Sequence, residues 1–360
     1  MVMFAEQYEY VIGGDPDRDT IDLAVVDAAT GAVLGYDADQ ADGPGYRRLL
    51  QWAVSQAPGR RVWALEGTGS FAAGFATVLA EAGEDVVEIN AGKRQRGAKS
   101  DRIDAVRAAR TALSREHQAA PRARGLREAL RQILVTRQGV LVSRTKAINE
   151  LKSLIVVAPE HLRAGLRGLS LAKQLQRIHE LTSSEQATVE HRVTVLTLKS
   201  IAARIEFLLA QTAQLEPELL KLVNDHPAGP ALLAEPGVGP VVAAQLLVSW
   251  SHRGRVRSEA AFASLAGVAP LEASSGQRSR HRLNRSGDRD LNRALHTVAI
   301  TRLRCNPESI AYETRRSAQG KTHRDVRRSL KRSLARRLYR RMQTATRPLT
   351  VPPKPAPAAA

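Results

Sequence analysis

The chain has 360 residues and a net charge of +18, because 54 Lys and Arg residues outnumber 36 Asp and Glu residues. This excess indicates a polyanionic partner, most simply nucleic acid, and no apolar run reaches the roughly 18 residues of a membrane-spanning helix, so no membrane partner is expected. The single Cys305 excludes an intrachain disulfide and a cysteine-based zinc site, and the acidic start MVMFAEQYEY is unlike a signal peptide, so we expect a cytoplasmic, nucleoid-associated bacterial protein.

Residues 8–36 predict three short strands, the last two joined by a hairpin turn at residues 27–31. Asp15 stands where the first strand is expected to end. It follows Gly13 and Gly14, whose missing side chains allow close approach of a bulky ligand. The other interpretation of Asp15 is turn chemistry, because Asp side chains bond their own backbone in turns.

A buried strand over residues 62–65 ends at Glu66, and a Gly-Thr-Gly turn then leads through a helix to a strand over residues 86–90. This spacing predicts a βαβ crossover with parallel pairing. Glu66 therefore lies at the carboxyl end of a strand, where the functional crevice of an α/β sheet is expected. Glu66 is equally suited to cap the helix that follows it.

The stretch KSDRIDA places Asp101 and Asp104 three residues apart at the start of a predicted helix. Such residues share one face, about 5–6 Å apart at Cβ. Two carboxylates that close repel each other by roughly 1–4 kcal/mol, and a divalent cation between them removes the repulsion. Lys99 and Arg102 beside them attract a polyanion. The alternative is that both acids are solvated and complement the helix dipole.

Three antiparallel strands, a βαβ unit and an acidic helix follow the order of an α/β ribonuclease-H-like domain. In that fold the first strand, the fourth strand and a later helix converge, which would bring Asp15, Glu66, Asp101 and Asp104 into one cleft. Four carboxylates in one cleft repel one another without cations. Two Mg²⁺ ions there would clamp a scissile phosphate between them.

Two long helices are predicted next, one from residue 107 to about 154 with an interruption at Pro121, and one over residues 186–223. A looser connector over residues 159–174 separates them. The pair is consistent with an antiparallel or intermolecular coiled coil, although its imperfect heptads also suit a plain helical bundle. Arginines recur along the first helix and indicate RNA or DNA contact, or else a solvated face.

The stretch EPGVGP lies between two apolar helical segments and is typical of a helix-hairpin-helix. Gly237 and Gly239 would let backbone N–H groups at the start of the second helix reach a DNA phosphate. The alternative is a tight turn that only packs two helices together.

A short helix over residues 258–268 is followed by a basic loop that contains Ser275, Arg278, Arg280 and Arg285. A flexible basic loop of this kind is most often a linker. A functional serine there would need activation. No fixed His/Asp partner is evident, but metal ions or arginines could supply the activation instead. Three further helices over residues 291–304, 308–321 and 324–342, and a disordered Pro/Ala-rich tail, complete the chain.

Six motifs, taken together, resemble the DEDD transposases of the insertion-sequence-110 family. They cover roughly residues 9–343, and they read GGDPDRDTIDLAVVD, LEGTGSF, INAGKRQRGAKSDRIDA, EPGVGPVVAAQLL, FASLAGVAPLEASSG and RSGDRDLNRALH. Any one motif is weak, but all six in this order at family-like spacings are highly specific. The chain departs from the family pattern at Gly14, Ala91 and Asn292, none of which is a proposed catalytic residue.

The resemblance implies four regions: a RuvC-type ribonuclease-H-like domain over residues 1–115, a helical coiled-coil linker over 116–226, a transposase domain over 227–343 and a tail over 344–360. The acidic tetrad maps onto Asp15, Glu66, Asp101 and Asp104, which would bind Mg²⁺. The serine nucleophile maps onto Ser275, although Ser274 directly precedes it. That serine would form a transient phosphoserine link with DNA.

The resemblance also implies partners. The catalytic site would combine two domains across subunits of a dimer or tetramer. A structured non-coding bridge RNA would pair with both donor and target DNA, so that base pairing reads the sequence. Two other functions fit the residues: a Holliday-junction-type nuclease in which metal-activated water attacks, and a nucleic-acid-binding protein without chemistry.

Overall fold

The computed structural model describes residues 4–89, 100–114, 118–184, 186–274 and 281–347. The chain divides into two compact units. The first comprises Met1–Ala123 together with Trp250–Ser258, and the second comprises Arg124–Ser249 together with Glu259–Ala360. A short segment from the second half of the sequence therefore belongs to the first unit. No helix in the described ranges combines the length and apolarity that a membrane crossing requires.

The first unit is built on a five-stranded sheet in the order β3-β2-β1-β4-β5. The pairs β1–β2 and β2–β3 are antiparallel, whereas β1–β4 and β4–β5 are parallel. The strands are β1 (Tyr10–Pro16), β2 (Thr20–Asp27), β3 (Val33–Gln40), β4 (Arg61–Glu66) and β5 (Asp85–Ile89). This topology confirms the predicted βαβ crossover. Strands β1 and β3 are longer than predicted, and Asp15, predicted at the end of the first strand, is the next-to-last residue of β1.

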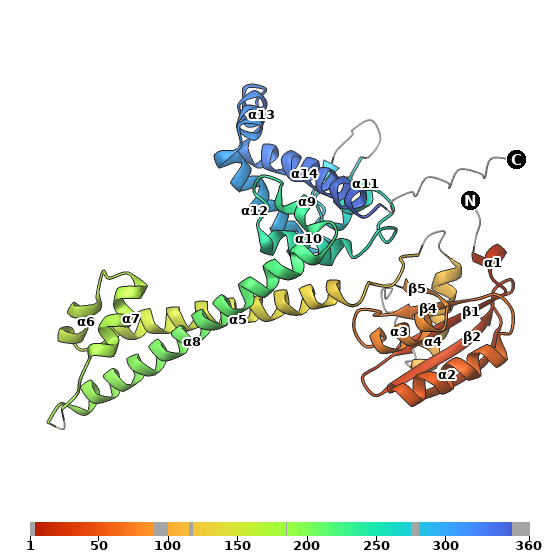
Figure 1. The fold of residues 1–360 in the computed structure, drawn as a ribbon, viewed down its shortest axis with the longest axis horizontal. Helices are drawn as coiled ribbons and strands as arrows, with labels where there is room; N and C mark the ends of the chain where they lie inside the picture. Colours follow the sequence, from red (N-terminus) through yellow and green to blue (C-terminus); the bar gives the residue numbers. More distant parts are fainter. Residues whose placement is uncertain (1–3, 90–99, 115–117, 185, 275–280, 348–360) are drawn as a thin grey trace, which may run out of the picture. The chain divides into compact units, whose positions relative to one another are not determined.

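Helices cover both faces of the sheet (Figure 1). On one face, α2 (Gly43–Gln56) and α3 (Ala73–Glu81) bury a core that includes Trp63 and Leu65. On the other face, α4 (Asp101–Leu113) packs on Ala64 and its neighbours, and α1 (Phe4–Gln7) is a short helix at the start of the described chain. Because side chains alternate along a strand, residues of β4 divide between the two cores.

Gly13 determines how closely α4 approaches the sheet. A Cβ atom at Gly13 would lie 2.0 Å from the carbonyl oxygen of Ala105 and 2.6 Å from the amide nitrogen of Ala109. At Gly14 a Cβ atom would lie 2.5 Å from a Leu65 methyl group. Both glycines are buried. The prediction that they make room for a bulky ligand is therefore wrong, because the space belongs to the protein's own core.

The second unit contains the two long helices, α5 (Leu126–Val157) and α8 (Val189–Asp225), which lie side by side in Figure 1. They run antiparallel, since Arg137 pairs with Glu216 at 3.3 Å and Glu150 pairs with Arg204 further along. The predicted loose connector is wrong. Its residues form α6 (Glu160–Leu166) and α7 (Leu171–Glu180), which bury leucines against the long pair.

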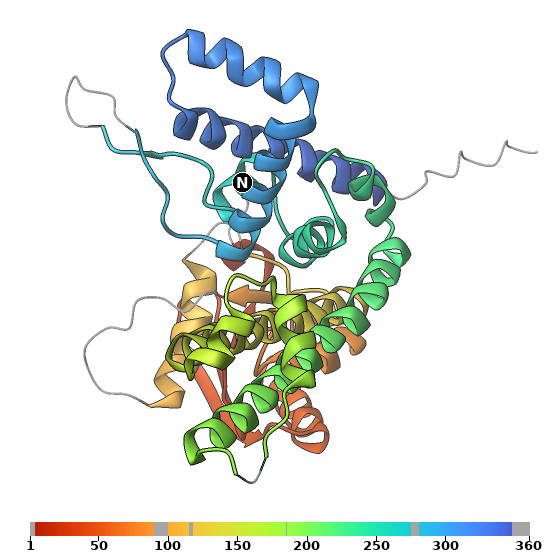
Figure 2. The same cartoon turned by 90° about the vertical axis from the view of Figure 1, so that its left-hand side faces the viewer.

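The rest of the second unit is mostly helical. Its elements are α9 (Gly229–Leu233), α10 (Pro240–Trp250), α11 (Glu259–Leu265), β6 (Leu271–Glu272), β7 (His281–Arg282), α12 (Arg289–Cys305), α13 (Pro307–Ala318) and α14 (His323–Ala345). Buried Glu235, in the turn between α9 and α10, accepts hydrogen bonds from Arg337 and Arg341 of α14. Strands β6 and β7 pair antiparallel and extend as an arm, drawn in cyan in Figure 2.

Candidate active site

Asp15 and Glu66 lie side by side at the carboxyl ends of two parallel strands. The register pairs Gly14 with Leu65, so the next residues along β1 and β4 are Asp15 and Glu66. Both carboxylates are half-buried and line a hollow of about 360 Å³. Phe71, more than half exposed, lines the same hollow. The functional crevice is therefore at the sheet edge where α/β proteins commonly place it.

Helix α4 brings the other two predicted acids to this edge. Its N-cap is Ser100, whose hydroxyl accepts a hydrogen bond from the Ile103 amide at 3.3 Å. Asp101 and Asp104 occupy the first turn. The close packing of α4 on Gly13 thereby sets this turn beside Asp15. Asp101 is exposed, whereas Asp104 is half-buried and paired with Arg107.

The electrostatics show that these acids share one environment. Burial, followed by the charges of Asp104, Glu66 and Asp101, raises the pKa of Asp15 to about 6. Burial and the charge of Asp104 also raise the pKa of Glu66, and Arg107 opposes this. A carboxylate whose ionised form is disfavoured by neighbouring anions is one that a cation would stabilise.

Asp22 is a further acid at this edge that was not predicted from the sequence. It lies directly opposite Asp15 in the antiparallel register of β1 and β2. Burial and the charge of Asp101 raise the pKa of Asp22, while Arg102 lowers it. An Asp inside an apolar strand was the available signal. A solvated strand position gives the same pattern, so this signal alone does not single out Asp22.

The donor set fits a hard divalent cation, because carboxylate oxygens are the ligands that Mg²⁺ prefers. The residue types fit a metal ion, but the positions of the described side chains do not form a metal site. Within the described ranges, no three His, Cys, Asp or Glu side chains are spaced to hold a metal ion. One carboxylate oxygen of Asp104 accepts a hydrogen bond from the Arg107 guanidinium and therefore faces that group.

The predicted DNA-contacting glycines behave differently from each other. Gly237 has a φ of +81°, and a Cβ there would meet Val298, Arg302 and Thr301 of α12 within 3.4 Å. Gly237 is thus required by turn geometry and packing. Gly239 is exposed, precedes α10, and has open space where a side chain would be.

The base of the β6–β7 arm is held by bonds to the end of α11. The Asn284 amide donates to the Ser264 carbonyl at 3.3 Å, and the Asn292 amide donates to the Ala266 carbonyl at 2.7 Å. Lys331 of α14 in turn donates to the Asn292 side-chain oxygen at 3.0 Å. These bonds fix the point from which the arm extends.

Two family models match the chain. Residues 12–158 match a DEDD model of IS110, described as a transposase, and residues 230–314 match the model described as Transposase IS116/IS110/IS902 family.

The chain belongs to the IS110 family of transposases. The first match contains all four acids of the candidate site, and the second contains the α9–α10 turn and the β6–β7 arm. One IS110 relative is the insertion element IS110 uncharacterized 43.6 kDa protein of Streptomyces coelicolor, which is 36% identical over 130 residues. That alignment covers 36% of this chain and 32% of the relative. The chain thus spans about a third of the length of this curated relative.

The remaining residues predicted from the IS110 motifs fall into two groups. Arg102 and Arg285 are exposed, and the Arg102 guanidinium lies 5.6 Å from the ring centroid of Tyr36. The others lie outside the described residues, as does most of the predicted tail: Lys99, Ser275, Arg278, Arg280 and residues 348–360.

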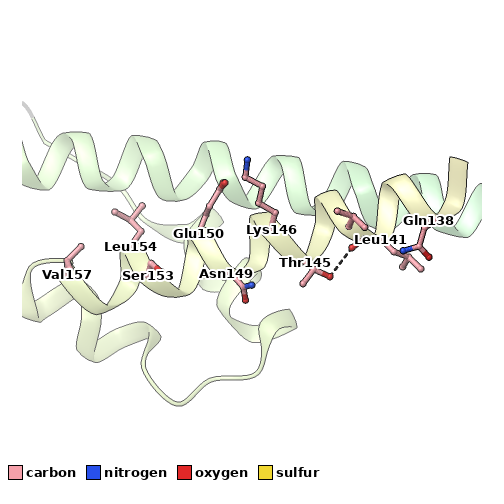
Figure 3. Close-up of a pocket in the computed structure, with 10 residues that line it drawn as sticks. Gln138, Leu141, Thr145, Lys146, Asn149, Glu150, Ser153, Leu154 and Val157 are labelled. Atoms are coloured by element: carbon pink, nitrogen blue, oxygen red, sulfur yellow. Dashed lines mark hydrogen bonds between the residues drawn. The ribbon is translucent and has the colours of Figure 1, made fainter. Parts of the chain in front are cut away.

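A larger hollow, of about 960 Å³, lies along α5 (Figure 3). Its lining includes Leu141, Val142, Leu154 and Val157, all from this one helix. It contains one carboxylate, that of Glu150, which pairs with Arg204. The hollow is lined mostly by apolar surface and gathers no group of carboxylates, so the smaller acidic hollow is the candidate active site of this IS110 protein.

Proposed function

We propose that this chain is the DNA transposase of an insertion sequence, a recombinase that cuts and rejoins strands by phosphoryl transfer. The observation that carries the proposal is the shared electrostatic environment of four carboxylates from three separate segments, Asp15, Glu66, Asp101 and Asp104. Family membership and the net charge of +18 support DNA as the substrate.

The first region would be a ribonuclease-H-like domain of the RuvC type. Three antiparallel strands continued by two parallel ones, with an acidic helix across them, support this assignment for residues 1–115. The antiparallel packing of α5 on α8 supports a coiled-coil linker over residues 116–226, which leaves residues 227–343 as the transposase domain.

The four acids would hold Mg²⁺, with two ions at the site. Bound there, the metal would polarise the scissile phosphate and stabilise the leaving oxygen. The protein's own part is to supply oxygen ligands from half-buried side chains on a rigid sheet edge. Arg107 keeps the Asp104 side chain in place until a cation replaces it.

Ser275 would be the nucleophile. Its hydroxyl oxygen would bond to a DNA phosphorus while the bond from that phosphorus to the adjacent nucleoside oxygen breaks, and the leaving oxygen takes up a proton. The arm formed by β6 and β7, with its hydrogen-bonded base, supports a role in delivering this residue. Arg278, Arg280 and Arg285 would contact the DNA backbone beside it.

The turn between α9 and α10 would act as a helix-hairpin-helix. The exposed Gly239 at the start of α10 supports phosphate contact by backbone N–H groups there, while Gly237 shapes the turn. Lys99 and Arg102 would attract DNA toward the carboxylates.

A non-coding bridge RNA and a second copy of the chain would complete the machinery. Two exposed lysines on α5, Lys146 and Lys152, support an RNA partner. Four exposed apolar residues on α8, spaced four, three and eleven residues apart, fall on one face of the helix, which supports a dimer or tetramer. These residues are Val189, Val193, Leu196 and Phe207. Light scattering of the full chain, and sequencing of co-purified RNA, test the two partners.

The test of the proposed function is a recombination assay with the full chain, its co-purified RNA, and donor and target DNA. Joined DNA products are expected with Mg²⁺ and none with EDTA. After denaturation, part of the DNA should remain bound to protein. Cleavage without any bound DNA would instead identify a junction nuclease that uses water, and salt-sensitive binding without cleavage would identify a binding protein.

A further inference from the structure

Glu88 lines the acidic hollow together with Asp15 and Glu66, and it reaches the hollow from the opposite face of the sheet. The parallel register pairs Glu88 with Leu65, and Ile89 with Glu66. Leu65 packs into the core under α2 and α3, whereas Ile89 packs into the core under α4. Glu88 therefore leaves β5 on the α3 face, and Glu66 leaves β4 on the α4 face. Both line the same hollow.

The charge of Glu88 is compensated by groups that hold it on its own face. Its side chain is only 8% exposed, and Arg255 approaches one carboxylate oxygen at 2.8 Å. The Thr68 hydroxyl donates to that same oxygen at 2.9 Å. Arg122 lies 3.7 Å from the other oxygen. Burying a carboxylate is costly unless it is paired and hydrogen-bonded, and these three groups supply that pairing for Glu88.

Arg255 belongs to the segment Trp250–Ser258, which comes from the second half of the sequence but forms part of the first unit. Two contacts hold the segment there besides the ion pair. Arg255 donates to the Ala120 carbonyl, and the Ser251 hydroxyl accepts from the Ala123 amide at 2.9 Å. The segment therefore supplies, at a defined position, the cation that Glu88 needs.

We propose that Arg255 is a positioning residue that keeps Glu88 out of the divalent-cation site formed by Asp15 and Glu66. This inference rests on the proposed function, since it requires that Asp15 and Glu66 bind a cation. Without Arg255, Glu88 would keep only the Thr68 hydroxyl and the more distant Arg122 guanidinium as partners beside a dication. It would turn into the hollow, bind the cation, and draw it away from the position that Asp15 and Glu66 define.

Replacing Arg255 should raise the affinity of the site for a cation, whereas loss of a purely structural ion pair should not. Arg255→Ala frees the Glu88 carboxylate to become an added oxygen ligand, so cation affinity should rise by about three- to tenfold. DNA cleavage should fall at the same time. In Arg255→Ala with Glu88→Gln the affinity should return to the wild-type value, and Glu88→Gln alone should leave it unchanged.

The measurement is terbium luminescence titration of the full chain without DNA, combined with the Mg²⁺ dependence of cleavage. Arg61 and Glu84 provide the matched control. They form a second ion pair on the same sheet, with 2.5 Å between the Arg61 nitrogen and the Glu84 oxygen and with side chains 19% and 10% exposed. Arg61 begins β4 and Glu84 directly precedes β5, so the pair lies at the end of these strands away from the hollow. Arg61→Ala should lower stability and leave terbium affinity as it was. Arg255→Lys should retain most of the wild-type behaviour.

The outcomes separate the two proposals. If wild-type protein binds no terbium, or binds it equally after Asp15→Ala, the metal site of the proposed function is wrong. If wild-type protein binds terbium through Asp15 and Arg255→Ala leaves that affinity unchanged or weaker, the positioning role alone is wrong. Should Arg255→Ala fail to fold, a drop in terbium affinity in Glu88→Gln would overturn the inference, because Glu88 would then be a ligand itself.

Discussion

Asp15 and Asp104 belong to different layers of the first unit, yet they act on each other. Burial first, and then the charge of Asp104, raises the pKa of Asp15 to about 6. The two residues meet because α4 packs directly on Gly13, two positions before Asp15 on the same face of β1. The acidic site is therefore a product of backbone packing between a helix and a strand.

The first prediction concerns pH. The folded pKa of Asp15 lies above its unfolded value, so its contribution to stability is fully present below about pH 4 and is lost as the pH rises through about 6. In EDTA at pH 7, Asp15→Asn should therefore raise the free energy of unfolding by about 1–2 kcal/mol, after discounting the shift for solvent screening of a half-buried group. Urea unfolding at pH 5 and pH 7 measures this. An equal gain at both values would contradict it.

The second prediction concerns the acids in catalysis. Single alanine variants of Asp15, Glu66, Asp101 and Asp104 should each lower strand exchange by at least about a hundredfold, since each removes an oxygen ligand from the metal site. Product formation on a sequencing gel measures the loss. Asp37→Ala, at an exposed acid on β3, is the control and should keep full activity. Wild-type rates in any tetrad variant would remove that residue from the site.

The third prediction concerns the nucleophile. Ser275→Ala should abolish both strand exchange and the DNA that stays bound to denatured protein, because it removes the hydroxyl oxygen proposed to form the phosphoserine bond. Ser274→Ala should retain both. Electrophoresis of labelled DNA under denaturing conditions reports the bond directly. The reverse pattern in the two variants would assign the nucleophile to Ser274.

The fourth prediction concerns Gly13. Gly13→Ala places a methyl group against the backbone of α4, so we expect a loss of about 2–4 kcal/mol in stability and reduced cation binding as Asp101 and Asp104 move away. Gly139→Ala, in open space on an exposed face of α5, should instead raise stability by about 1 kcal/mol. Thermal unfolding of both variants checks the contrast. Equal stability of Gly13→Ala and wild type would mean that α4 can shift freely.

Much of the fold followed from local patterns. Apolar alternation indicated the strands, Asp101 and Asp104 marked the start of the helix that became α4, and the βαβ spacing indicated parallel pairing. The connector between α5 and α8 was predicted as a loose segment but forms two short helices, because Leu162, Leu166, Leu175 and Ile178 find partners only on helices distant in the sequence. Periodicity in so short a segment does not reveal such partners.

The sequence by itself determined which residues could do chemistry at this site and which element each one occupies, because strand alternation and helix capping act over a few neighbouring residues. Only the tertiary structure decided that Asp15, Glu66 and α4 meet at one edge, that Asp22 faces Asp15, and that Arg255 neutralises Glu88. Those relationships depend on strand register and on helix–sheet packing between segments up to 167 positions apart, from Glu88 to Arg255. Contacts at that range leave no local pattern in a single chain.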